Sequence, residues 1–97
     1  IAEKGVAICG AGPIGKRIGR QLQKGYQRKL HAFFEVNPRR VGETILDAPV
    51  HGTNSIGEYQ GRAGLLSAVG QSGARERVRE LTFAAGFVEG EDFYCVA

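Results

Sequence analysis

Residues 5–15 constrain the fold most, because four consecutive apolar residues lead directly into a Gly-x-Gly-x-x-Gly spacing. A helical pattern of apolar side chains follows at once. This order predicts a buried strand, a tight turn and a helix, which together form the first unit of a parallel α/β sheet. We expect Gly10 to allow the turn and Gly15 to let the helix pack against the sheet. Pro13 fits the first helical turn, where a missing N–H is tolerated.

The same turn has the features of an anion site. Gly12 lets the backbone approach a phosphate closely, the free N–H groups at the start of the helix face the ligand, and the helix dipole favours a negative charge there. The sequence therefore predicts that the phosphates of a nucleotide bind to Gly10, Ala11, Gly12, Pro13, Ile14 and Gly15. The alternative is a glycine turn that serves only helix–sheet packing.

Apolar spacing predicts the remaining elements. In the first helix Ile14, Ile18 and Leu22 recur every four residues and predict the buried face. The patterns predict strands at 5–10, 29–36, 64–69 and 93–96, and helices at 13–24 and 74–85. We expect residues 44–50 to be irregular or briefly extended, and residues 51–63 look too short and too broken for a crossover helix. The fold class is therefore α/β, a small Rossmann-like domain with about four parallel strands and flanking helices.

In an open parallel sheet, ligands bind beyond the carboxyl ends of the strands. Three segments converge there in this interpretation: the turn at 10–15, the strand end at 35–40 and a second glycine turn at 70–73. Glu35 follows the last motif glycine by twenty residues, a distance at which an acidic side chain accepts hydrogen bonds from a ribose diol. The alternative for Glu35 is a charged residue at an exposed strand end. We expect Gly70 to contact the ligand as well, while Arg39 and Arg40 lie near a ligand phosphate or in a solvated turn.

Composition limits the function further. The chain has 97 residues, which predicts one domain. It begins with Ile and contains no Met, which predicts a piece of a longer protein or a processed one. Its net charge is +3, but Lys and Arg are spread over several segments, so we expect no nucleic-acid partner. No apolar run approaches the ~20 residues that a membrane span needs.

We find no catalytic or metal-binding constellation in the sequence. Cys9 and Cys95 lie inside predicted strands without metal-ligand spacing, so we expect two buried thiols in a reducing, cytoplasmic compartment. His31 is predicted to be structural, and His51 could reach a ligand but has no catalytic partner. We therefore assign no residue of the chain to catalysis or to metal binding.

Longer stretches of the chain carry a resemblance. The motif at 6–15, the segment Phe34-Glu-Val-Asn-Pro-Arg-Arg-Val-Gly42 and the tail Ala48-Pro-Val50 resemble Rossmann-like domains of bacterial surface-sugar enzymes, including the nucleotide-sugar-binding domain of sugar O-acyltransferases. Residues 68–75 and 86–97 resemble the carboxyl-terminal extension of bacterial family-two glycosyltransferases. The resemblance implies an accessory domain of a sugar transferase whose ligand contacts are Gly10, Gly12, Gly15 and Glu35.

We therefore expect a non-catalytic domain that binds a nucleotide-sugar or NAD(P), without a metal, within a larger glycosyltransferase-type enzyme. The alternatives are the cofactor half of an NAD(P)-dependent oxidoreductase and a structural or dimerisation module without ligand. The expected partners are a nucleotide-type small molecule and the remainder of a longer chain, and the sequence leaves a homodimer open.

Overall fold

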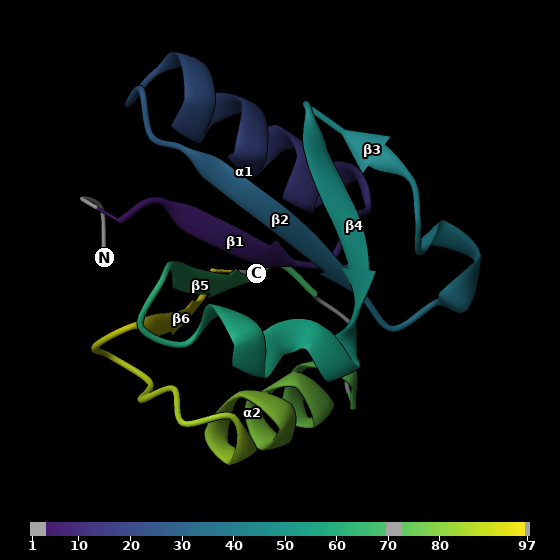
Figure 1. The fold of residues 1–97 in the computed structure, drawn as a ribbon, viewed down its shortest axis with the longest axis vertical. Coiled ribbons are helices and arrows are strands. Elements are labelled where there is room, and N and C mark those ends of the chain that lie inside the picture. Colours follow the sequence, from purple (N-terminus) through teal and green to yellow (C-terminus); the bar gives the residue numbers. More distant parts are fainter. Residues whose placement is uncertain (1–3, 70–72, 97) are drawn as a thin grey trace.

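A six-stranded sheet with helices on both sides forms the protein (Figure 1). The computed structural model describes residues 4–69 and 73–96. Its elements are β1 (Val6–Cys9), α1 (Pro13–Lys24), β2 (Leu30–Glu35), β3 (Thr44–Ile45), β4 (Ala48–Gly52), β5 (Gly64–Ser67), α2 (Ala74–Ala84) and β6 (Phe93–Cys95), with short 3₁₀ helices η1 (Pro38–Arg40) and η2 (Thr53–Tyr59). The strand order is β3-β4-β2-β1-β5-β6, with β3 antiparallel to β4 and the other neighbouring pairs parallel. The structure confirms the predicted α/β, Rossmann-like fold class.

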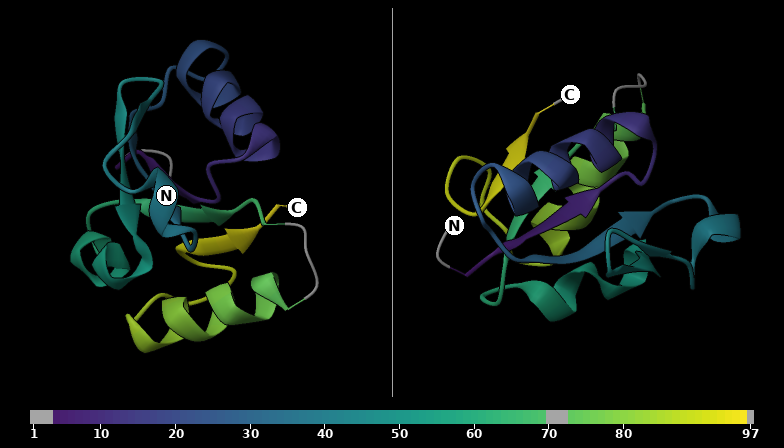
Figure 2. Two further views of the ribbon diagram at one scale, coloured as in Figure 1. Left: turned by 90° about the vertical axis from the view of Figure 1, so that its right-hand side faces the viewer. Right: turned by 90° about the horizontal axis from the view of Figure 1, so that it is seen from above.

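The two faces of the sheet are covered by different helices (Figure 2). α1 lies on one face, and α2 and η2 lie on the other. Side chains alternate along β1, so that Val6 and Ile8 join the apolar core beneath α1, whereas Ala7 and Cys9 join the core beneath α2 and η2. Because β1 is buried on both faces, it appears in the sequence as a continuous apolar run.

The buried side of α1 is formed mainly by its glycines. Gly15 and Gly19 are the buried residues of the helix, and a Cβ at Gly19 would come within 3.1–3.3 Å of side chains from β2 and the β3–β4 turn. Ile18 and Leu22 are only half-buried, and Ile14 is 46% exposed. The glycines bring the helix so close to the sheet that the larger side chains lie on the flanks of the contact. The prediction that Ile14 belongs to the buried face is therefore wrong.

A hairpin formed by β3 and β4 lies in the region expected to be irregular or briefly extended. Leu46 and Asp47 join the two strands with φ of 54° and 63°, the left-handed pair typical of a two-residue type I′ turn. Asn and Gly usually mark such turns, so the sequence carried no indication of this one. β4 then pairs with β2, with Val50 beside Phe33. The sheet therefore has six strands instead of about four.

The crossover from β4 to β5 contains a short 3₁₀ helix, whereas the sequence predicts no crossover helix in residues 51–63. η2 spans Thr53–Tyr59, and its Ile56 is 1% exposed in the core beneath α2 and η2. A 3₁₀ helix rises more per residue than an α-helix. Seven residues therefore cover a distance for which an α-helix would need a longer segment.

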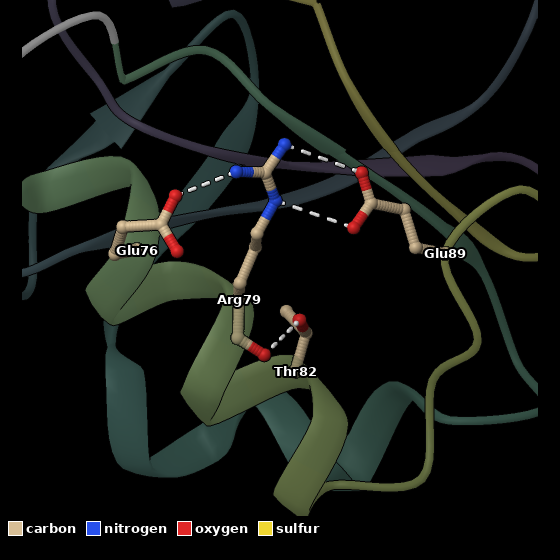
Figure 3. A network of polar contacts seen from close by, with 4 residues as sticks. All are labelled: Glu76, Arg79, Thr82 and Glu89. Atoms are coloured by element: carbon tan, nitrogen blue, oxygen red, sulfur yellow. Dashed lines mark hydrogen bonds and ion pairs between the residues drawn. The ribbon is translucent and has the colours of Figure 1, made fainter.

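A polar network connects α2 to the loop before β6 (Figure 3). Arg79 donates hydrogen bonds to both carboxylate oxygens of Glu89, at 3.2 and 3.4 Å, and to Glu76 at 2.7 Å. The Thr82 hydroxyl donates to the Arg79 carbonyl oxygen at 3.1 Å. Because the side chains of Arg79, Glu76 and Glu89 are exposed to solvent, their ion pairs orient the loop and add little to stability.

Candidate functional site

An open cleft of about 630 Å³ lies at the carboxyl ends of β1, β2 and β5. It is lined by Gly10, Gly12, Pro13, Ile14, Glu35, Val36, Asn37, Ala68, Val69, Ala74 and Arg77. The three segments that the sequence brought to this edge do meet here, through the glycine turn, the end of β2 and the residues on either side of 70–72. Gly70 itself lies outside the described residues.

Two of the motif glycines are required by the fold. Gly10 has a φ of +109°, and a Cβ there would lie 3.2 Å from the Val69 side chain and 3.3 Å from the Ala68 carbonyl carbon. A Cβ on Gly15 would overlap the Gly10 carbonyl oxygen. The structure confirms the tight turn at Gly10. At Gly15 the closest approach is between helix and turn, whereas the Ile8 side chain of the sheet is 3.6 Å away.

Gly12 has no such reason to be glycine. Its backbone is extended, with φ −80° and ψ −169°, and a Cβ there would meet no protein atom within 4 Å. Neither conformation nor packing therefore excludes a side chain at this position. The space in front of Gly12 is part of the cleft.

The start of α1 opens into the same space. Gly12 is the N-cap and Pro13 occupies the first turn, no side chain caps the helix, and the first turn contains no acidic residue. The first N–H groups of a helix have no intrahelical acceptor and carry a partial positive charge. This end of α1 can therefore accept an anion from the cleft.

Glu35 and Arg40 bind the two peptide groups on either side of the Ala11 Cα. The Glu35 carboxylate accepts hydrogen bonds from the Ala11 N–H at 3.0 Å and the Asn37 N–H at 3.3 Å, and Arg40 Nη1 donates to the Ala11 carbonyl oxygen at 3.3 Å. Each carboxylate oxygen has more than one acceptor site, so Glu35 can still accept from a ligand hydroxyl. Arg39, in contrast, is exposed. A ribose contact by Glu35 stays a prediction, and the structure adds that Glu35 shapes the glycine turn.

Besides the predicted contact Ile14, the cleft is lined by Val36, Val69 and Arg77, which the sequence did not identify as ligand contacts. Ile14 and Val36 are 46% and 54% exposed, and together with Val69 they give the cleft apolar surface. Arg77, on the first turn of α2, adds a cation, which also lies 3.6 Å from Glu80. An apolar residue directly after the acidic end of β2 was the available indication for Val36. Nothing in the local sequence pointed to Arg77.

The remaining titratable candidates do not line the cleft. Burial raises the pKa of the Cys9 thiol to about 12, with smaller contributions from Cys95 and Glu35, so Cys9 is not a nucleophile at neutral pH. His31 Nε2 lies 2.6 Å from the Lys4 carbonyl oxygen, a structural contact as predicted. His51 Nε2 lies 3.3 Å from the Tyr59 hydroxyl on the η2 side of the sheet, so the expectation that it could reach the ligand is wrong.

Two further features concern what the described residues lack. Residues 4–69 and 73–96 contain no group of His, Cys, Asp or Glu that could hold a metal ion. Within the same ranges no helix is long and apolar enough to span a membrane.

In comparisons with known proteins, the matches cover most of the chain. A family model described as CoA binding domain matches residues 2–85. Among solved structures, the chain is similar to RSP, a Rex-family repressor, with a TM-score of 0.74, and to RSP in complex with beta-NADH or with beta-NAD+ and operator DNA, each with a TM-score of 0.72. Sequence identity is 18% in all three, and the matches cover 94%, 95% and 94% of this chain. A comparison with curated proteins finds no significant match.

The structural matches cover only part of the repressor chain. They cover 51%, 52% and 48% of the repressor chain, so this chain spans about half the length of RSP, and similarity at this identity concerns the fold alone. The resemblance to glycosyltransferases and sugar O-acyltransferases finds no support in the comparisons.

Proposed function

We propose that this chain, which belongs to the family of CoA-binding domains, is a non-catalytic domain that binds a nucleotide, with NAD(H) as its preferred ligand. The main support is the start of α1, which no side chain caps and which opens into the cleft. Beside it lies Gly12, where a Cβ would meet no protein atom within 4 Å. A diphosphate bound there would accept hydrogen bonds from the first N–H groups of α1.

The rest of the cleft suits the remainder of such a ligand. Glu35 can accept from the hydroxyls of a ribose attached to the diphosphate. Ile14, Val36 and Val69 form an apolar surface on which the planar base of the ligand can pack. Arg77 also lines the cleft and can neutralise a second negative group of the ligand.

Glu35 is also the reason for preferring NAD(H) to CoA or NADP(H). The adenosine ribose of NAD(H) carries two free hydroxyls, whereas CoA and NADP(H) carry a phosphate on that ribose. A phosphate beside the Glu35 carboxylate would be repelled. Of the two arginines that follow β2, Arg40 already donates to the Ala11 carbonyl oxygen and Arg39 is exposed. The NADH complex of the structurally similar RSP supports this choice, and the family description supports CoA as the second candidate.

Calorimetric titration of the chain with NADH, NADPH, CoA and a UDP-sugar tests the proposal. We expect NADH to bind most tightly. Glu35→Gln should weaken NADH binding by about tenfold or more, the equivalent of one charge-assisted hydrogen bond. The same variant should also bring the dissociation constants for NADH and NADPH closer together, because the negative charge that repels the extra phosphate is gone. Glu43→Gln, at an exposed position outside the cleft, is the matched control.

Each alternative has its own outcome in this titration. Tighter binding of CoA than of NADH would overturn the preference and leave CoA as the ligand. Tightest binding of the UDP-sugar would favour the nucleotide-sugar expected from the sequence. Binding of none of the four would refute the proposed function and leave a structural module.

A further inference from the structure

The outer side of α1 carries positive charge that no acid in the helix balances. Residues 11–34 contain six Lys and Arg and no Asp or Glu. Within the described residues, the ion pairs between side chains lie on α2 and the loop after it. α1 itself lies at the surface, on the face of the sheet opposite α2 (Figure 2). Of the four cations of α1, Arg17, Arg20 and Lys24 are exposed and Lys16 is half-buried.

Three of these cations meet at one place. Arg17, Arg20 and Lys24 are exposed and line an open cavity of about 620 Å³ together with Gln21, Gly25 and Tyr26. In the sequence the cations looked spread along the chain, and we expected no nucleic-acid partner. The helix brings them together, because residues three and four apart lie on the same side of an α-helix.

The cavity also contains an exposed aromatic ring. Tyr26 follows the end of α1 and is 70% exposed, which leaves its face available for stacking. With a rise of ~1.5 Å per residue, the step from Arg17 to Lys24 is about 10 Å along the helix. Along the axis of a duplex each strand has one phosphate per ~3.4 Å, and an extended single strand has a wider spacing, so the three cations can contact at most about three phosphates.

We propose that this face of α1, formed by Arg17, Arg20, Lys24 and Tyr26, binds single-stranded nucleic acid. The cations contact successive phosphates, and Tyr26 stacks on an unpaired base. The ring distinguishes this occupant from an acidic protein, which would need the cations alone, and from a duplex, whose bases are already stacked. None of the four residues lines the nucleotide cleft, so the two sites are separate.

Fluorescence anisotropy of labelled oligo(dT) and oligo(U), mixed with the chain at low salt, tests the proposal. We expect the logarithm of the association constant to fall against that of the salt concentration with a slope of about −2, from three phosphates at ~0.7 each. The variant R17Q/R20Q/K24Q should lose this binding. The variant K4Q/R39Q/R62Q changes the net charge equally at exposed positions outside this cavity and should retain it.

The ring and the choice of ligand are tested in the same assay. Tyr26→Ser should weaken binding by about tenfold, the lower part of the range for one base–aromatic stack, and Tyr26→Trp should restore it. Equal loss in the two triple variants, equal binding of duplex DNA or poly-glutamate, or displacement of the oligonucleotide by NADH would each overturn the proposal. Circular dichroism establishes that every variant used is folded.

Discussion

Alanine at Gly12 and alanine at Gly15 should have opposite consequences, although both glycines belong to one motif. A Cβ at Gly15 would overlap the Gly10 carbonyl oxygen and lie 3.0 Å from its carbon. This neighbour is backbone and cannot rotate away, so the cost is at the upper end of overpacking, about 3 kcal/mol. The better helix propensity of Ala returns about 1 kcal/mol. The net loss of about 2 kcal/mol lowers the Tm of a domain of this size by roughly 8–16 °C.

Gly12→Ala should leave the fold nearly unchanged. The added Cβ meets no protein atom within 4 Å and the backbone is already extended. The poorer N-cap and the reduced entropy of the unfolded chain each amount to about 0.5–1 kcal/mol and act in opposite directions. The Cβ does, however, occupy the space in front of the start of α1. We therefore expect NADH binding to weaken by about 10–100-fold, the equivalent of one hydrogen bond to a charged group.

Thermal unfolding with and without NADH measures both effects together. At NADH ten times above the Kd, the unmodified chain should gain about 1.4 kcal/mol, or roughly 6–11 °C in Tm. At the same NADH concentration Gly12→Ala should gain less than about 3 °C. A Tm loss in Gly12→Ala as large as in Gly15→Ala would refute the structural reasoning. An unchanged response of Gly12→Ala to NADH would refute the placement of the phosphates.

Three further predictions concern the core and the surface. Ser67→Ala should leave the free energy of unfolding in urea unchanged or raise it, because the Ser67 hydroxyl is buried without a hydrogen-bond partner; a clear loss would contradict this. The free energy of unfolding should fall between pH 9.0 and about pH 12, because the Cys9 thiol loses its proton at a lower pH in the unfolded chain than in the folded chain. Denaturation at several pH values should show a smaller fall in Cys9→Ala. Glu89→Gln should lower the Tm slightly at low salt and not at all in 1 M NaCl, given that its contact with Arg79 is exposed; a salt-independent loss would show a different role.

Part of the candidate site follows from rules that act over a few neighbouring residues. The apolar run of β1, the positive φ of Gly10 and the place of Pro13 in the first turn all agree with the sequence patterns. The same rules located the carboxyl end of β2 and therefore Glu35. They failed at the β3–β4 hairpin, because Leu46 adopts a left-handed conformation that its side chain does not favour and no glycine marks the turn.

Local patterns in the sequence are enough to predict a strand, a glycine turn and a helix of a parallel α/β sheet, because side-chain periodicity and the backbone freedom of glycine are local properties. The surroundings of that turn depend on tertiary structure. Glu35 and Arg40 reach Ala11 across 24 and 29 residues of sequence because β2 lies beside β1 in the sheet. Arg77 joins the cleft because α2 follows β5, on the other side of β1. The order of strands depends on packing between distant segments, and no local pattern contains it.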